Sequence, residues 1–227
     1  MSGSPPTSRP TADRDERRLV ELTQQAYDAT ADRYAARWNT ADPMVEVKRR
    51  FLAVAGSPSA VVDLGCGTGR DMSWFADRGL RVVGIDRSAA MLSIAKRTAP
   101  TARLIRADVR QLPLRSESVD AWLACASLLH LPPAGMATAL SEARRVTRHD
   151  GVGLVTVREG VGARLERVSS TGHRRYFCYW TADDLDHAVE RAGWRIMEGW
   201  GSRDSLGRQP WITRVVTRFS SRVASCR

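Results

Sequence analysis

The stretch Val61–Asp71, VVDLGCGTGRD, ends an apolar run and then places glycine at every second position, at Gly65, Gly67 and Gly69. An apolar, β-branched run that stops at glycines is typical of a buried strand followed by a tight turn. Glycine adopts positive φ angles and lets the backbone approach a neighbouring group more closely than any Cβ allows. Ligands of open α/β sheets bind just outside such strand ends. The stretch therefore predicts a strand over residues 60–64 and a large ligand lying against the turn.

Beyond Gly56-Ser57-Pro58, short β-branched runs alternate with helical patterns along the rest of the chain. We predict strands over 60–64, 81–85, 102–106, 119–125, 152–157, 194–200 and 211–218. We predict helices over 70–78, 88–97, 135–147 and 181–191. Such alternation indicates βαβ units, and therefore an α/β protein whose mostly parallel sheet is covered by helices on both faces.

The 227 residues are enough for one domain with a substantial core. Residues 1–18 are rich in Pro, Ser, Thr and charge, so we expect a disordered tail there. Apolar and aromatic residues then recur at helical spacing over 19–55, with a break at Asp42-Pro43. We expect one domain over 19–219 that begins with this helical segment, and a short tail over 220–227.

The formal net charge is +10, carried mainly by arginines that are spread over nearly every segment. A nucleic-acid-binding protein gathers such charge on one face or stripe, so the spread disfavours a nucleic-acid partner. Three local basic clusters, at 48–50, 144–145 and 173–175, are interpreted as solvated faces.

The four cysteines are widely scattered, with no CxxC spacing and no visible metal site, which predicts free thiols in a reducing compartment. The chain start lacks the apolar region of a secretory signal, and no run of about 18 apolar residues is present to span a bilayer. The cytoplasm is the expected location, with no membrane partner.

Charge at the glycine turn bears on the kind of ligand. The dinucleotide pattern G-x-G-x-x-G needs glycine at position 70, where this chain has Arg70. Asp63 stands two residues before the first glycine, where a carboxylate repels a pyrophosphate but can pair with a cationic ligand. The turn therefore favours a ligand without phosphate over NAD.

Two further carboxylates follow neighbouring predicted strands. Asp86 closes the second strand, 21 residues after Gly65, the position from which a carboxylate accepts both hydroxyls of a ribose. Asp108 closes the third, where it can take the exocyclic amine of an adenine flanked by the apolar Met91 and Val109. Each aspartate alone is more often a helix cap or loop residue, but the joint spacing predicts a nucleoside site.

Taken together, these segments resemble the class I S-adenosylmethionine (SAM) dependent methyltransferases. The matching segments are DLGCGTG (63–69), GIDRS (84–88) with Met91-Leu92, ADV (107–109) with Leu112-Pro113, SVD (118–120), LLHL (128–131) and EARRV (142–146). The resemblance runs from about Tyr27 to Phe219. It implies a Rossmann-like sheet of seven strands in the order 3-2-1-4-5-7-6, an N-terminal helical lid over 19–55, SAM as cofactor and S-adenosylhomocysteine (SAH) as product. One departure is the turn RHDGV (148–152), where the family usually has Pro-Gly-Gly.

The same resemblance implies contacts for each part of the cofactor. Its methionine end faces Asp63 and the turn residues Gly65, Cys66, Gly67 and Gly69. For the adenosine end, the implied contacts are Asp86 with the ribose hydroxyls, Arg87 and Met91 with the adenine faces, and Asp108 with Val109 at its amine. Ser127, after the fourth strand, is placed near the donor methyl.

His130 follows the fourth strand at the mouth of this site, and imidazole titrates near neutral pH. Two roles stay open for it. It is either a general base that deprotonates the methyl acceptor, or a residue that only hydrogen-bonds the backbone and shapes the pocket.

Two other segments lie where the acceptor is expected. The resemblance places Tyr27 and Tyr34 in a lid that closes over cofactor and substrate, whereas Trp38 is interpreted as packing. The segment 158–180 is too long for an ordinary connection, and it is either a specificity-determining insertion or an extra hairpin with a solvated basic turn.

The sequence thus predicts an enzyme that transfers a methyl group from SAM to oxygen or nitrogen of a small molecule, such as a secondary metabolite. Alignment of the nucleophile is expected to be its main contribution. Two alternatives stay open: an RNA or tRNA methyltransferase, and a protein of the same fold that binds SAM without methylating or that catalyses a rearrangement. The sequence gives no indication of oligomeric state.

Overall fold

The computed structural model describes residues 9–39, 42–204 and 207–218, with side chains from residue 14. Helices and short helical turns within these ranges are α1 (Arg9–Asp28), α2 (Ala31–Trp38), α3 (Val45–Ala55), α4 (Arg70–Ala76), α5 (Ala89–Thr98), η1 (Leu128–His130), α6 (Pro133–Val146) and α7 (Ala182–Arg191). Strands are β1 (Ala60–Leu64), β2 (Arg81–Asp86), β3 (Arg103–Arg106), β4 (Val119–Cys125), β5 (Thr147–Arg158), β6 (Ala163–Arg167), β7 (Arg174–Cys178), β8 (Trp194–Arg203) and β9 (Pro210–Arg218).

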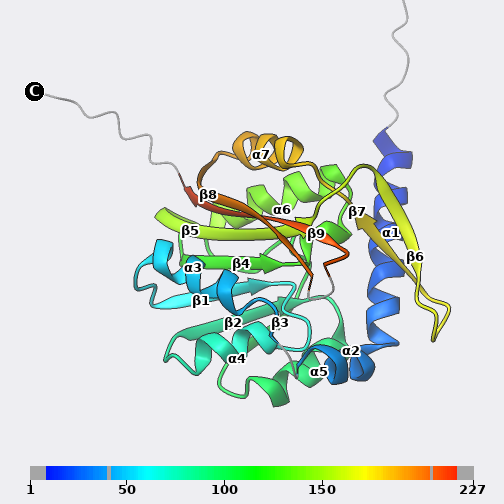
Figure 1. The fold of residues 1–227 in the computed structure, drawn as a ribbon, viewed down its shortest axis with the longest axis horizontal. Coiled ribbons are helices and arrows are strands. Elements are labelled where there is room, and N and C mark those ends of the chain that lie inside the picture. The colour runs from blue at the N-terminus through cyan, green and yellow to red at the C-terminus, as the bar shows by residue number, and fades with distance from the viewer. Residues whose placement is uncertain (1–8, 40–41, 205–206, 219–227) are drawn as a thin grey trace, which may run out of the picture.

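Seven of the strands form one twisted sheet in the order β3-β2-β1-β4-β5-β9-β8 (Figure 1). The strands from β3 to β5 run parallel, and β9 pairs antiparallel with both β5 and β8. Strands β6 and β7 form a separate hairpin outside this sheet, so they only shift the numbering of its last two strands. Without them the order is 3-2-1-4-5-7-6, which confirms the predicted sheet.

Residues that alternate along β4 divide the core between the two faces of the sheet. Trp122 and Ala124 pack in the cluster covered by α6, α7 and β7, whereas Ala121 and Leu123 pack in the cluster covered by α3 and α4. Because both faces are buried, the strands read as continuous apolar runs. Helices cover both faces, as the sequence predicted.

The N-terminal helix α1 begins earlier than expected. Residues 9–18, predicted to belong to a disordered tail, are helical, whereas residues 1–8 and the predicted tail 220–227 lie outside the described residues. The Glu16 carboxylate accepts a hydrogen bond from Arg110 at 2.5 Å. This ion pair ties the early turns of the helix to the loop after β3, a long-range contact that composition alone does not reveal.

The insertion 158–180 contains the β6–β7 hairpin, one of the two forms left open by the sequence. Figure 1 shows β7 running beside α1. The backbone N–H of Tyr176 donates to the hydroxyl of Thr23 at 2.9 Å, which fastens the hairpin to the helix. The hairpin therefore becomes a wall next to the N-terminal segment.

Two further observations concern membrane-spanning helices and the cysteines. None of the described helices is long and apolar enough to cross a membrane. Within the described part of the chain, Cys66, Cys125 and Cys178 are free thiols, as predicted, and Cys226 lies outside it.

Candidate functional site

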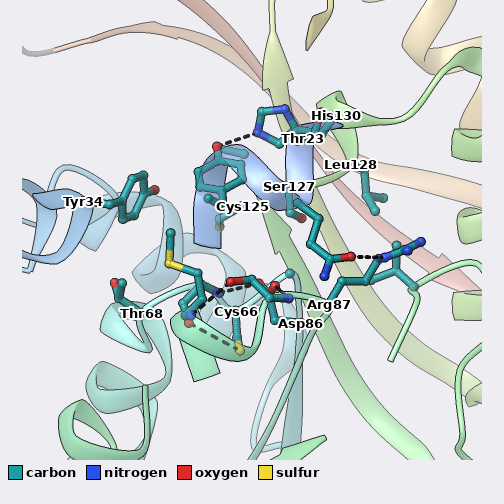
Figure 2. A pocket seen from close by; sticks show the side chains of 18 of the residues that line it. Thr23, Tyr34, Cys66, Thr68, Asp86, Arg87, Cys125, Ser127, Leu128 and His130 are labelled. Atoms are coloured by element: carbon teal, nitrogen blue, oxygen red, sulfur yellow. Dashed lines mark hydrogen bonds between the residues drawn. The ribbon is translucent and has the colours of Figure 1, made fainter. Parts of the chain in front are cut away.

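A cavity lies at the carboxyl ends of β1, β2 and β4, under α1 and α2 (Figure 2). In this view His130 and Tyr34 lie across the pocket from Cys66 and Asp86. The predicted site residues that line it are Tyr27, Tyr34, Gly65, Cys66, Gly67, Asp86, Arg87, Met91, Asp108, Val109, Ser127 and His130. The topology thus brings together residues from five separate parts of the chain.

The three positions of the turn require glycine for different physical reasons. All three adopt positive φ, at +81° for Gly65, +51° for Gly67 and +85° for Gly69. A Cβ on Gly65 would lie 2.3 Å from the Cβ of Ser127, and one on Gly69 would lie 3.0 Å from the Cα of Ala95. Only Gly67 would direct a Cβ into open space. Gly69 does not line the cavity; its close approach to Ala95 instead allows α4 to pack against α5, and its predicted cofactor contact stays a prediction.

Asp63 lies within β1, beneath the turn, and does not line the cavity either. Its side chain is buried, and its Oδ2 atom has no hydrogen-bond partner among the described residues. Burial raises the pKa of this carboxyl well above its usual value, and the neighbouring Asp71 raises it further. The side chain thus lies below the turn, and its predicted contact with the methionine end stays a prediction.

Asp86 closes β2 and points into the cavity. Its Oδ2 accepts the N–H of Gly67 at 2.9 Å, and its Oδ1 accepts the N–H of Ser88 at 2.8 Å. Burial raises the pKa of Asp86, and these two N–H groups oppose that rise. A carboxylate offers about four acceptor positions. Each oxygen therefore keeps one position, which suits the two adjacent hydroxyls of a ribose.

Asp108 is differently engaged. Its Oδ1 accepts the backbone N–H and the Nε–H of Arg110, at 2.9 and 3.0 Å. Its Oδ2 accepts from Arg110 at 2.7 Å and from Arg87 at 2.5 Å. All four acceptor positions of the carboxylate are thus filled. The predicted hydrogen bond from an adenine amine to this side chain has no free acceptor here, because arginines two and 21 residues away in sequence already fold onto it.

His130 is buried at the opposite end of the cavity. Its Nδ1 lies 2.7 Å from the carbonyl oxygen of Tyr176, which can only accept, so Nδ1 carries the proton. Its Nε2 then accepts the hydroxyl of Tyr27 at 2.7 Å. Burial, with added repulsion from Arg175 and Arg158, lowers the pKa of His130 to about 3 despite the hydrogen bond to Tyr176. His130 is therefore a neutral imidazole whose only basic nitrogen is already occupied.

Aromatic side chains close the cavity from above. The rings of Tyr27 and Tyr34 meet edge to face, with centroids 5.7 Å apart, and Trp38 lies 6.4 Å from Tyr34. Trp38 also lines the cavity, which corrects its interpretation as a packing residue alone. Trp38 is the last residue of α2, four residues after Tyr34, so the helical period places both rings on one face.

Several lining residues were not predicted. They are Val20, Thr23, Gln24, Trp38, Asn39, Thr68, Arg70, Asp71, Ser88, Ala107, Cys125, Ala126, Leu128 and Leu131. Val20, Thr23, Gln24 and Tyr27 share one face of α1 at helical spacing, a signal that the sequence carries. The others, such as Asn39, follow from loop conformation.

Two of the basic clusters also differ from the prediction. Lys48 is fully buried, with its Nζ 2.6 Å from Asp42 and 2.9 Å from Asp71. The guanidinium of Arg175 lies between aromatic rings, 5.4 Å from the centroid of Tyr27 and 5.3 Å from that of Phe177. Neither cation belongs to a solvated face. Carboxylates and rings from other elements receive them, and local sequence does not contain those partners.

The site as a whole suits a nucleoside whose remaining part lies along the glycine turn. Asp86 offers two free acceptor positions, Gly67 offers a backbone surface with open space above it, and Met91 offers a buried apolar side chain. In the described part of the chain, no group of three or more His, Cys, Asp and Glu side chains is placed to hold a metal ion. The Rossmann-like fold and this strand-end cavity define the class of α/β proteins that bind nucleoside cofactors at the switch point of the sheet.

Comparisons with known proteins specify that class. Residues 61–151 match the family model described as a methyltransferase domain. The chain is 29% identical over 134 residues to malonyl-[acyl-carrier protein] O-methyltransferase of Serratia marcescens, covering 58% of this chain and 52% of that protein. It is 47% identical over 73 residues to trans-aconitate 2-methyltransferase of Paracidovorax citrulli, covering 31% and 28%. The chain thus spans about half, or less, of the length of these curated relatives.

A solved structure shows the same fold over nearly the whole chain. It is the 1,6-didemethyltoxoflavin-N1-methyltransferase of Burkholderia thailandensis, with bound 1,6-didemethyltoxoflavin and S-adenosylhomocysteine. The TM-score is 0.76 at 19% identity, over 96% of this chain and 94% of that one. The chain therefore shares the fold of this methyltransferase over nearly its whole length, and within it residues 61–151 match a methyltransferase domain.

Proposed function

We propose that the protein binds SAM and transfers its methyl group to an oxygen or nitrogen atom of a small molecule. The observation that carries this proposal is Asp86, which keeps two acceptor positions at a strand end directly beside the glycine turn. The methyltransferase names of the relatives and the SAH in the Burkholderia structure support the choice of SAM among nucleoside ligands.

In this proposal each side of the cavity binds one part of the ligand. Asp86 accepts the ribose hydroxyls, Met91 and Arg87 flank the adenine, and the backbone at Gly67 faces the methionine end. Tyr27 and Tyr34 cover the cofactor and exclude water. When bound, SAM supplies a methyl group on a positively charged sulfur, which needs no further activation.

The acceptor must then provide a nucleophile that is already reactive. His130 is neutral, and its Nε2 accepts from Tyr27, so it is not free to take a proton from the acceptor. We therefore assign His130 a positioning role in place of the base considered from the sequence. It holds the phenol of Tyr27 against the acceptor side of the cavity. Rate enhancement then comes from alignment of the acceptor with the methyl group.

Binding of SAH to the purified protein, without added metal, tests the cofactor assignment. Asp86→Ala removes the ribose acceptors and should weaken SAH binding by about 1.5–3 kcal/mol in calorimetry. The exposed Asp77, at the end of α4, provides the control Asp77→Ala, which should bind SAH normally. Equal SAH affinity in both variants would remove Asp86 from the site.

Turnover tests the reaction itself. Incubation with isotopically labelled SAM and pools of small molecules should yield labelled products detectable by mass spectrometry. SAH binding with no labelled product from any pool would favour a protein that binds the cofactor without methylating.

A further inference from the structure

The β6–β7 hairpin places an arginine behind Tyr27 and His130, which line one end of the cavity, although the arginine itself is not among the lining residues. Side chains alternate along β7, so Arg175 and Phe177 share one face. That face meets the cavity wall: the ring of Phe177 lies 4.6 Å from that of His130, and the Arg175 guanidinium lies 5.4 Å from that of Tyr27. Arg175 thus stands beside the two residues that close this end.

The positive charge of Arg175 has no matching carboxylate in the described structure. Glu166 lies directly opposite Arg175 in the hairpin register. Its Oε1, however, accepts from Arg158 at 2.9 Å and from the hydroxyl of Tyr179 at 2.7 Å. Glu166 therefore neutralises Arg158, and no ion pair of Arg175 within 4.0 Å is found among the described side chains.

Burial makes this surplus charge costly. The Nε atom of Arg175 is buried and has no hydrogen-bond partner in the described part of the chain. A buried, unpaired polar or charged group costs free energy that a bound partner recovers. Asp86, the free acidic acceptor of the cavity, lies at the other end, where backbone N–H groups hold it. The His130 end thus carries one unmatched positive charge.

We propose that Arg175 recognises a carboxylate of the methyl acceptor where β7 meets α1, beside Tyr27 and His130. This inference rests on the proposed function and names its substrate class, whichever atom of the acceptor takes the methyl group. A single surplus charge matches a monoanionic carboxylate better than a dianionic phosphate. The planar guanidinium also fits a carboxylate with two parallel hydrogen bonds.

The test uses hydroxy- and amino-substituted monocarboxylic acids, each paired with its primary amide. The pairs are assayed for methyl transfer from labelled SAM, and for calorimetric binding to protein saturated with SAH. We expect the acids to bind and react in preference to their amides. Arg175→Met should lower kcat/KM for the acid on the order of 10- to 100-fold, with SAH affinity unchanged.

Two variants control for charge and for folding. Arg174→Met removes the same charge from the exposed neighbour on the same strand and should leave acid turnover unchanged. Arg175→Lys keeps the charge without the planar fork and should retain an intermediate rate.

Amides that bind and react as well as the acids would overturn the inference, as would SAH-saturated protein that takes none of the acids. An Arg175→Met variant that loses no more than Arg174→Met would overturn it too. Failure of the wild-type protein to bind SAH would instead refute the proposed function.

Discussion

The two ends of the cavity satisfy their charges in different ways. At the glycine-turn end, the buried Lys48 has Asp42 and Asp71 within 2.9 Å, and Arg70 makes two hydrogen bonds to Asp71. Burial opposes ionisation of Asp71, but Arg70 and Lys48 lower its pKa. At the His130 end, Arg175 has rings around it and no paired carboxylate among the described residues.

This difference distinguishes cations that stabilise the fold from cations that are available to bind a ligand. A cation whose partners come from its own chain is part of the folded framework, because removing it leaves buried carboxylates unmatched. A cation without such partners contributes little to folding and is available to a ligand. A positive charge near the cavity therefore stabilises the fold when a carboxylate of the chain pairs with it, and serves substrate binding when none does.

The largest expected effect comes from Lys48→Met. The variant removes the fully buried cation of this network and leaves Arg70 alone beside Asp42 and Asp71, so the free energy of unfolding should fall by about 3–5 kcal/mol in urea titrations. Arg49→Met, on the exposed side of the same helix, should change it by less than about 0.5 kcal/mol. A loss below about 1 kcal/mol for Lys48→Met would contradict the account of this end as a completed ion-pair network.

The glycine-turn end can also be disturbed sterically. In Gly65→Ala the new Cβ would meet Ser127 at 2.3 Å and hold a left-handed φ, so unfolding should become easier by about 2–4 kcal/mol. Gly67→Ala should cost only about 1 kcal/mol, because its Cβ meets open space, but it should weaken SAH binding. Thermal unfolding and calorimetry separate the two outcomes. The reverse order of stabilities would show that Gly65 is not tightly packed.

At the other end, acid should destabilise the protein through His130. The unfolded histidine has a pKa near 6.5 and takes up a proton below it, whereas the folded pKa is about 3. Stability is therefore lost as pH falls below about 6.5, and His130 should account for about 2 kcal/mol between pH 7.5 and pH 5. Urea titrations at both pH values should show this difference shrink in His130→Gln. The other three histidines are exposed and remain in both proteins. An identical pH dependence in the variant would contradict the neutral, buried state.

The smallest expected effect completes the comparison. Arg175→Met removes a cation that has no paired carboxylate among the described residues and a buried Nε without a partner, so the free energy of unfolding should stay the same or rise by about 0.5 kcal/mol. Measured beside Lys48→Met under the same conditions, it distinguishes a ligand-binding cation from a structural one. A loss of several kcal/mol would show that Arg175 belongs to the framework instead.

Much of the fold could be predicted because its signals are local. The strands 60–64 and 119–125 have the predicted bounds, and Asp86 closes β2 as expected. Apolar, β-branched runs that end at glycine or aspartate mark strand ends without help from distant residues. The helix α1 is the exception, since it begins at Arg9, and its Glu16 pairs with Arg110 from the loop after β3, a partner that local sequence does not reveal.

The site was predicted less completely, because several roles depend on where neighbours lie. Asp108 looked like a free acceptor in sequence, but Arg87 and Arg110 fill its four acceptor positions. His130 looked like a titrating base, but burial and the Tyr27 hydroxyl remove its basic nitrogen. Hydrogen-bond occupancy and desolvation are properties of the packed molecule.

The sequence by itself determined the order of strands and helices, the glycine turn and the row of strand-end residues around Asp86. These follow from backbone preferences and from side-chain alternation, which act over a few residues. Only the tertiary structure decided why Gly65 must be glycine, which buried cation is paired and which nitrogen of His130 holds the proton. Each of those depends on atoms tens of residues away in the chain, such as Ser127 against Gly65 or Tyr176 against His130. Charges and hydrogen bonds are settled by proximity in space, and that proximity exists only after the chain has folded.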